Sequence, residues 1–325
     1  MRIGYKLMAE SFGPAELVRQ AVRAESAGFD FVEISDHYHP WLEEQGHSPF
    51  AWTVLGAIAE RTGRIGLATG VTCPTVRYHP AVIAQAAATL ALLSDGRFTL
   101  GLGSGERLNE HVTEGFPESV RVRHDLLGEA VAIIRLLWTG GYHSYEGKHL
   151  RLRDARVFDL PGTPPPIALA AGGPRAAALA AELGDALFAT EDDPELVRVY
   201  RDTGGTGPCY AEVPLAWAAD PSAAAHAAHR SFRWSVHGWK VLTELPGPAA
   251  FDAACTTVGE DDMLQAFACG PDVGVHLERA QRYVDAGFDT LALLNAGPDP
   301  DGFLDFYQRE LDGPIRGLTA SADRP

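Results

Sequence analysis

The segment from Ser35 to Trp41 carries a carboxylate and two imidazoles, the residue types that move protons, directly after a predicted strand. Asp36 adjoins His37, and a carboxylate beside a histidine can fix the ring tautomer and raise its basicity. Trp41 would add a flat apolar wall. His37 and His39 could also ligate a metal, but the other predicted strand ends offer too few further ligands. The pattern favours acid–base chemistry, and we expect no metal.

A second carboxylate, Glu106, ends a glycine-rich run that starts at Gly101 after another predicted strand. Glycine there would let a flat ligand approach the backbone closely. The spacing does not match the dinucleotide-binding fingerprint, because the third glycine is misplaced and no amphipathic helix begins at once. Gly172 and Gly173 precede Pro174 at the start of a predicted helix, and the free N–H groups of such a start commonly bind phosphate.

These motifs provide acids, bases and anion-binding backbone, but neither a nucleophile elbow nor a metal-ligand cluster. Another group must therefore supply the demanding chemistry, most simply a bound cofactor.

The elements that must position these residues alternate between strand and helix along the chain. The predicted strands are 3–7, 29–34, 65–71, 97–102, 167–171, 186–189, 210–217 and 290–294. Eight strand–helix units favour a closed (β/α)8 TIM barrel in the α/β class, and a doubly wound sheet is the competing architecture. We expect a single domain over residues 1–325. Its long insertions, expected at the C-terminal face, are about 103–121, 139–165 and 218–271.

A short internal sequence repeat supports a closed barrel. Ala27-Gly28-Phe29-Asp30 near the start of the chain is matched by Ala286-Gly287-Phe288-Asp289 near its end. In both, glycine stands where a helix ends and an apolar strand follows.

Composition excludes several classes of partner. Lys and Arg number 27 against 43 Asp and Glu, which gives a net charge of −16. An acidic chain repels nucleic-acid backbones and anionic membranes, so we expect neither as a partner. There is no secretory leader pattern and no apolar run of about 18 residues. The four cysteines form no CxxC pair, which indicates reduced thiols and a cytoplasmic protein.

Taken together, the motifs resemble the deazaflavin-dependent branch of the luciferase-like barrel family, and within it the F420-dependent glucose-6-phosphate dehydrogenase group. The resemblance covers most of the chain and rests on pieces that occur jointly and in order. They are Ile3-Gly4-Tyr5-Lys6, Ser35-Asp36-His37 to Trp41, Pro74-Thr75 with Arg77-Tyr78, Pro80 to Gln85, Gly103-Ser104-Gly105-Glu106 to Asn109-Glu110, and Ala170 to Pro174.

The resemblance implies hydride transfer with coenzyme F420 as cofactor, and FMN as the alternative. It implies that His37 is the catalytic base, that Glu106 is the proton donor near the deazaflavin ring and that Trp41 packs at the reacting centre. It also implies that Asp36 touches the cofactor and supports the base. The remaining cofactor-binding positions that it implies are Val71 at a strand-end bulge, Cys73, Ser104, Gly105, Asn109, Gly172 and Gly173.

The chain departs from the sugar-phosphate enzymes where a substrate phosphate would bind. Glu191-Asp192-Asp193 follows Thr190 where that group would place a lysine, and residues 251–270 contain no Lys or Arg. A phosphate would be repelled there.

We therefore expect a small neutral substrate, an alcohol or an unphosphorylated sugar, near Thr190 and Trp234, and not glucose 6-phosphate. The alternatives are a reductase that uses F420H2 and an FMN-dependent monooxygenase of the same superfamily. The resemblance also implies a homodimer.

Overall fold

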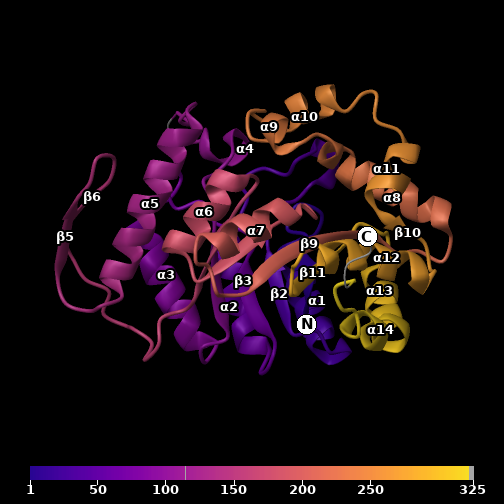
Figure 1. Cartoon of the computed structure of the whole chain (residues 1–325), viewed down its shortest axis with the longest axis horizontal. Helices are drawn as coiled ribbons and strands as arrows, with labels where there is room; N and C mark the ends of the chain where they lie inside the picture. Colours follow the sequence, from indigo (N-terminus) through magenta and orange to yellow (C-terminus); the bar gives the residue numbers. More distant parts are fainter. Residues whose placement is uncertain (114, 322–325) are drawn as a thin grey trace.

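Eight parallel strands close into a barrel (Figure 1). They are β1 (Arg2–Leu7), β2 (Phe31–Ile34), β3 (Gly66–Thr69), β4 (Phe98–Leu102), β7 (Ile167–Ala170), β8 (Ala186–Ala189), β9 (Cys209–Ala216) and β11 (Thr290–Asn295). Each strand pairs with the next, and β1 pairs with β11 to complete the ring. The predicted TIM barrel is thus confirmed in this computed structural model, which describes residues 1–113 and 115–321. Residue 114, in the expected insertion 103–121, and residues 322–325, at the end of the expected domain, lie outside the described residues.

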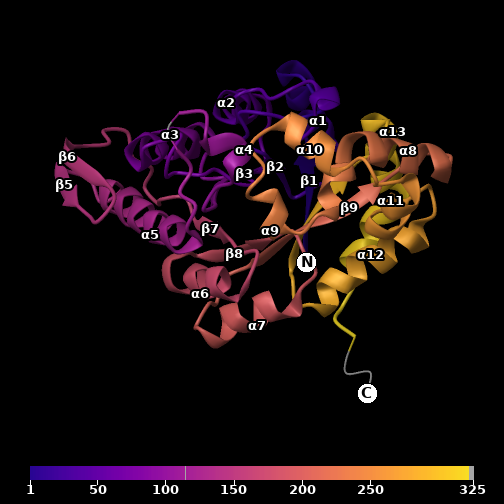
Figure 2. The same ribbon diagram turned by 90° about the horizontal axis from the view of Figure 1, so that it is seen from above.

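The helices that return the chain surround the barrel (Figures 1 and 2). They are α1 (Pro14–Ala27), α2 (Ala51–Arg61), α3 (Pro80–Leu93), α5 (Val120–Leu137), α6 (Pro174–Leu183), α7 (Pro194–Asp202), α12 (Val273–Asp285) and α13 (Pro300–Phe306). Several begin with proline, whose missing N–H costs nothing in the first turn of a helix. A π-helical turn (Tyr307–Leu311) and α14 (Asp312–Arg316) follow α13. No helix of the described residues is long and apolar enough to cross a membrane.

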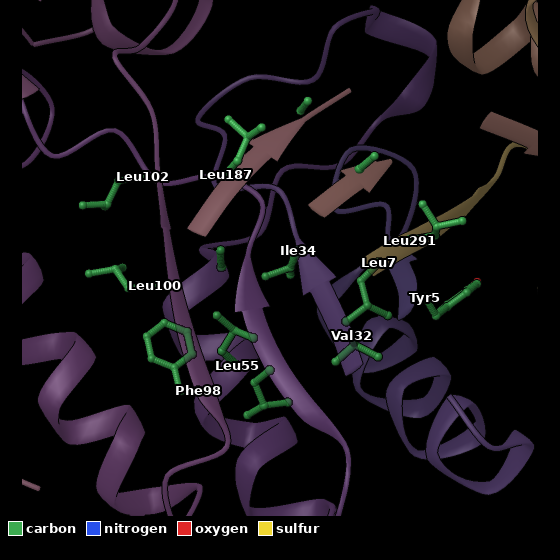
Figure 3. Packing of buried hydrophobic residues seen from close by; sticks show 14 of the residues in the cluster. Tyr5, Leu7, Val32, Ile34, Leu55, Phe98, Leu100, Leu102, Leu187 and Leu291 are labelled. Carbon is green, nitrogen blue, oxygen red and sulfur yellow. The ribbon is translucent and has the colours of Figure 1, made fainter. Parts of the chain in front are cut away.

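Alternation along the strands separates the apolar core from the barrel interior. Tyr5 and Leu7 of β1 pack with Val32 and Ile34 of β2 in the layer between strands and helices (Figure 3). Because successive side chains of a strand point to opposite faces, the intervening Lys6 faces the inside of the barrel. Polar side chains such as that of Lys6 therefore point into the barrel, while the aliphatic side chains of β1 and β2 pack against the helices.

The two repeated segments build the same joint on the two sides of β1. Gly28 and Gly287 both have left-handed backbone conformations, with φ of 96° and 95°. The Asp30 carboxylate accepts a 2.7 Å hydrogen bond from the N–H of Ile3, and the Asp289 carboxylate accepts one of 3.1 Å from the N–H of Cys209. In each joint an aspartate therefore fixes the start of a neighbouring strand.

Two of the three expected insertions lie at the carboxyl ends of the strands. The first carries α4 (Arg107–Glu110). The third carries α8 (Pro221–Phe232), a 3₁₀ turn (Arg233–Val236), α9 (Trp239–Leu242), α10 (Pro248–Ala254), α11 (Glu260–Ala266) and β10 (Ala268–Cys269). This third insertion forms a second apolar cluster with residues of the β2 loop, including Trp41. Another short 3₁₀ turn (Glu43–Gln45) lies in the β2 loop.

The segment 139–165 corrects the expectation. It joins the end of α5 to the start of β7, so both of its ends lie at the opposite end of the barrel from the strand C-termini, and the part between them runs back along α5, where Lys148 pairs with Asp125. It folds into the antiparallel hairpin of β5 (His143–Glu146) and β6 (Arg151–Ala155), which projects beside α5 (Figure 1). A connection from a helix to the next strand starts and ends at the amino-terminal face of the barrel, whatever its length.

Candidate active site

A cavity of about 660 Å³ opens at the carboxyl ends of the barrel strands. It brings together almost every residue that the sequence singled out. Those lining it are Asp36, His37, Trp41, Val71, Cys73, Ser104, Gly105, Glu106, Gly172, Gly173, Thr190 and Trp234. Asn109 is the exception. The volume is that of an ordinary small-molecule site.

His37 lies between two carboxylates at this cavity. Its Nδ1 atom is 2.8 Å from Oε1 of Glu10, and its Nε2 atom is 3.6 Å from Oε1 of Glu106. The contact with Glu10 is an ion pair rather than an aligned hydrogen bond. Burial alone would lower the pKa of His37, but the charge of Glu10, helped by Glu106, outweighs burial and raises that pKa above its usual value. The ring is therefore a stronger base than a free imidazole.

Sequence reasoning missed Glu10, although a signal for it exists. In the β1–β2 register Leu7 pairs with Ile34, and Glu10 and His37 each lie three residues beyond those partners. Two residues that lie equally far beyond a pair of aligned strand ends come close together at the barrel mouth. Burial favours the neutral acid, but His37 and Lys6 hold the pKa of Glu10 below its usual value, so the carboxylate stays charged.

The prediction that Asp36 supports His37 is wrong, because no hydrogen bond joins the two side chains among those that Asp36 makes. Asp36 turns away from the histidine and is 2 % exposed. Its carboxylate accepts hydrogen bonds from the side chains of Thr72 at 2.7 Å, Trp52 at 3.1 Å and Tyr78 at 3.0 Å. Adjacent residues in extended backbone point in opposite directions, so Asp36 anchors the loop while His37 faces the cavity.

Asn109 lies behind Glu106 and outside the cavity lining, and its contact with the cofactor stays a prediction. Its side-chain N–H donates to Oε1 of Glu106 at 2.5 Å. Its carbonyl oxygen accepts from the backbone N–H groups of Tyr38 and His39, at 2.7 and 3.2 Å. Asn109 thus ties the acid to the loop that carries the base.

The glycine-rich wall presents backbone rather than side chains to the cavity. An added Cβ at Gly103 would lie 2.8 Å from a methyl of Val71, and one at Gly105 would lie 2.6 Å from Sγ of Cys73. The peptide bond between Gly70 and Val71, where a bulge was expected, is cis. Burial raises the pKa of the Cys73 thiol, which therefore stays neutral. Opposite, Gly173 precedes the first turn of α6 without a side-chain cap.

Aromatic rings form the outer wall. Trp41 stacks on Trp234 with ring centroids 4.0 Å apart, and its edge meets the His37 ring at 5.1 Å. Trp239 donates from its indole N–H to the Thr190 hydroxyl at 2.9 Å. The third insertion therefore supplies the apolar side of the cavity, of which only Trp234 was predicted from the sequence.

Three charged residues lie on the floor, inside the barrel. Lys6 donates to the carbonyl oxygen of Gly70 at 2.8 Å and to Glu212 at 2.6 Å, and it lies 3.6 Å from Glu33. Burial, opposed by Lys6 and assisted by Glu212, raises the pKa of Glu33 to about 8. This cluster was not anticipated, because the sequence shows only single charges within apolar strands.

The possible HxH metal pair separates in space. His37 faces the cavity, whereas the ring of His39 packs against that of His111, with centroids 6.0 Å apart. Within residues 1–113 and 115–321, no group of three or more His, Cys, Asp or Glu side chains is arranged to hold a metal ion.

Comparisons with known proteins agree with this architecture. Residues 1–290 match the family model described as luciferase-like monooxygenase. An F420-dependent glucose-6-phosphate dehydrogenase of Intrasporangium calvum is 36 % identical over 98 % of this chain and 100 % of its own length. An F420-dependent hydroxymycolic acid dehydrogenase of Mycobacterium tuberculosis is 38 % identical over 94 % of this chain and 86 % of its own length.

A solved structure is similar over nearly the whole chain. It is that of an F420-dependent secondary alcohol dehydrogenase in complex with an F420–acetone adduct, with a TM-score of 0.89 and 28 % identity, covering 97 % of this chain and 98 % of the other. The chain is a TIM-barrel oxidoreductase, and the cavity lined by Glu10, His37 and Glu106 opens at the mouth of its barrel. It belongs to the luciferase-like family, and its resemblance to the F420-dependent group within that family is confirmed.

Proposed function

We propose that this protein is an F420-dependent dehydrogenase that oxidises the carbinol group of a small neutral alcohol or an unphosphorylated sugar. The observation that carries the proposal is the His37 ring, with Glu10 2.8 Å from one nitrogen and Glu106 3.6 Å from the other. A paired imidazole at a cavity floor is suited to take a hydroxyl proton. The dehydrogenase names of the similar proteins support the same reaction type.

The residues present fit a flat redox cofactor. The wall at Gly103 and Gly105 has no room for side chains, so a ring system can lie against backbone. The first turn of α6, which Gly172 and Gly173 precede, suits an anionic tail. Coenzyme F420, when bound, supplies the ring carbon that accepts a hydride. The protein then needs to add only a binding slot, a base and an acid.

His37 is the base, and Nε2 is the nitrogen that it offers, because Nδ1 faces Glu10. The carbinol C–H bond breaks with both electrons leaving as hydride, the O–H proton moves to Nε2, and a C=O bond forms. The charge of Glu10 stabilises the imidazolium that results. Glu106, in its protonated form, donates the proton that balances the reduction and then regains one from solvent, and Asn109 holds its carboxyl group in place.

The substrate is proposed to be neutral because of the apolar and acidic groups beside Thr190; the basic residues Arg123, Arg175 and Lys240 also line the cavity. Trp41, Trp234 and Trp239 provide flat apolar surface. Glu191 lines the cavity beside Thr190, and burial together with the neighbouring aspartates raises its pKa. A phosphate beside these acids would be repelled. The glucose-6-phosphate activity in the names of several similar proteins is therefore not transferred to this chain.

The test compares substrates with purified protein and F420 in the absence of oxygen. We expect loss of the oxidised cofactor's absorbance with a secondary alcohol or glucose, and a lower kcat/KM with glucose 6-phosphate. A preference for the phosphate would overturn the neutral substrate. Activity only with F420H2 and a ketone would reverse the direction, and oxygen uptake with reduced FMN alone would replace the cofactor.

We further propose that the chain is a single domain over residues 1–325, a homodimer and cytoplasmic. The four cysteines form no disulfide in the structure, which suits a reducing compartment. Sedimentation equilibrium tests the assembly, and a monomer mass at micromolar concentration would contradict the dimer. Fluorescence microscopy of a tagged chain tests the location.

A further inference from the structure

Arg77 is a buried cation that lies outside the cavity lining, in the segment between β3 and α3. Its side chain is only 7 % exposed. The guanidinium Nη2 atom donates to the backbone carbonyl of Asp36 at 2.5 Å and to the Asp36 carboxylate at 3.2 Å. The backbone N–H of the same residue donates to Oε2 of Glu110 at 2.8 Å. The side chain faces the same acid, with Nε 3.7 Å from Oε1 of Glu110, so the guanidinium pairs with both loops.

Each of these loops carries one member of the proposed acid–base pair. Asp36 immediately precedes His37 in the loop after β2. Glu110 lies one helical turn after Glu106, in the α4 segment after β4. Because α4 has only four residues, its own backbone hydrogen bonds stabilise it little, and tertiary contacts must fix it.

The orientation of Arg77 is itself fixed. Its guanidinium lies over the Tyr78 ring at 4.4 Å and donates to the Tyr78 hydroxyl at 2.7 Å. That hydroxyl in turn donates to the Asp36 carboxylate at 3.0 Å. A lysine could keep the buried charge but could not reproduce this planar, multiply bonded arrangement.

We propose that Arg77 is a positioning residue that holds His37 and Glu106 in register across the cavity while touching neither. This inference rests on the proposed roles of His37 and Glu106. If the two loops shift relative to each other, the base and the acid no longer meet the same reacting centre. A misplacement of about 1 Å can cost about a hundredfold in rate.

The test uses Arg77→Lys and Arg77→Ala, with Arg97→Lys as the matched control. Arg97 also donates to buried backbone carbonyls, those of Ala59, Thr62 and Ile65, but these belong to the end of α2 and its connection to β3, at the opposite end of the barrel from the proposed acid–base pair. We expect kcat to fall by about ten- to a hundredfold in both Arg77 variants, with KM nearly unchanged. Added guanidinium chloride should restore turnover to Arg77→Ala, whereas equal sodium chloride should not. Arg97→Lys should lower the unfolding temperature and leave kcat unchanged.

A second readout does not depend on turnover. In protein with ¹⁵N-labelled histidine, the His37 ring signals should move in Arg77→Lys and stay in place in Arg97→Lys. Full turnover in Arg77→Lys, or equal losses in both lysine variants, would overturn the positioning role. If the wild-type protein oxidises no alcohol, the proposed function has failed. Arg77 is then judged by the ring signals alone, and their constancy in Arg77→Lys would refute it. If Arg77→Ala does not fold, Arg77→Lys decides.

Discussion

Replacing Glu10 with glutamine tests the pair that defines the site. The amide has nearly the same shape as the carboxylate but carries no charge, 2.8 Å from Nδ1 of His37. Turnover requires His37 to become an imidazolium in the transition state, and Glu10 stabilises that charge. Glu10→Gln should therefore slow the chemical step without removing the base.

The size of the effect follows from the distance and the burial. Two unit charges 2.8 Å apart attract by about 6 kcal/mol at an effective dielectric constant of about 20. Most of this offsets the cost of burying both groups, and we take a remaining coupling of about 1.5–3 kcal/mol, at the low end of the values measured for close charge pairs. Because about 1.4 kcal/mol corresponds to a tenfold change in rate, kcat should fall by about ten- to a hundredfold.

The pH dependence adds a second signature. The base works only when His37 is unprotonated, so kcat/KM should rise with pH through the raised pKa of His37. In Glu10→Gln this pKa falls, so the rise should move to lower pH while the plateau drops. Glu60→Gln, on the exposed outer face of α2, is the control and should change neither. An unchanged plateau together with an unmoved rise in Glu10→Gln would refute the pairing.

Three other substitutions test the surroundings of the site. Glu33→Gln should flatten the pH dependence of stability. The pKa of about 8 in the folded state exceeds the unfolded value of about 4.3, so the wild-type Tm should fall as pH rises between these values; calorimetry with equal slopes for both proteins would contradict this. Gly105→Ala should lower the free energy of unfolding by about 1–3 kcal/mol, because φ is 85° and the new Cβ would lie 2.6 Å from Cys73. An unchanged midpoint of urea unfolding would argue against this strain. Trp41→Ala should lower the free energy of unfolding by about 3–5 kcal/mol, because it removes a buried ring stacked on Trp234. Trp41→Phe, the control, should retain most of the stability. Equal free energies of urea unfolding for wild type and Trp41→Ala would contradict this prediction.

The barrel was predictable because its causes are local. Apolar strands, amphipathic helices and the glycines at 28 and 287 recur along the chain, and parallel pairing of eight such units leaves few alternatives. The direction of segment 139–165 was not predictable from its length. Length alone does not say whether a long connection follows a strand or a helix, and this one follows α5.

The sequence predicts which loops meet at the site, but it does not predict which atoms contact one another. His37 and Glu106 follow different strands, and the rule that strand C-termini share one face placed them together. Glu10 stood in no motif, and its contact depends on the register of β1 against β2. Asp36 and Asn109 were assigned to the cofactor by resemblance alone. Those cofactor contacts stay predictions. The hydrogen bonds by which both residues hold neighbouring loops depend on side-chain directions, which the sequence does not reveal.

Isotope transfer from substrate to cofactor is the most direct test of the account. A secondary alcohol carrying deuterium at the carbinol carbon is incubated with the purified protein and F420, and the reduced cofactor is analysed by mass spectrometry. We expect one deuterium in the reduced cofactor from this alcohol, and none bound to carbon when the unlabelled alcohol is oxidised in deuterated water. Reduced cofactor without deuterium from the carbinol carbon would contradict the account.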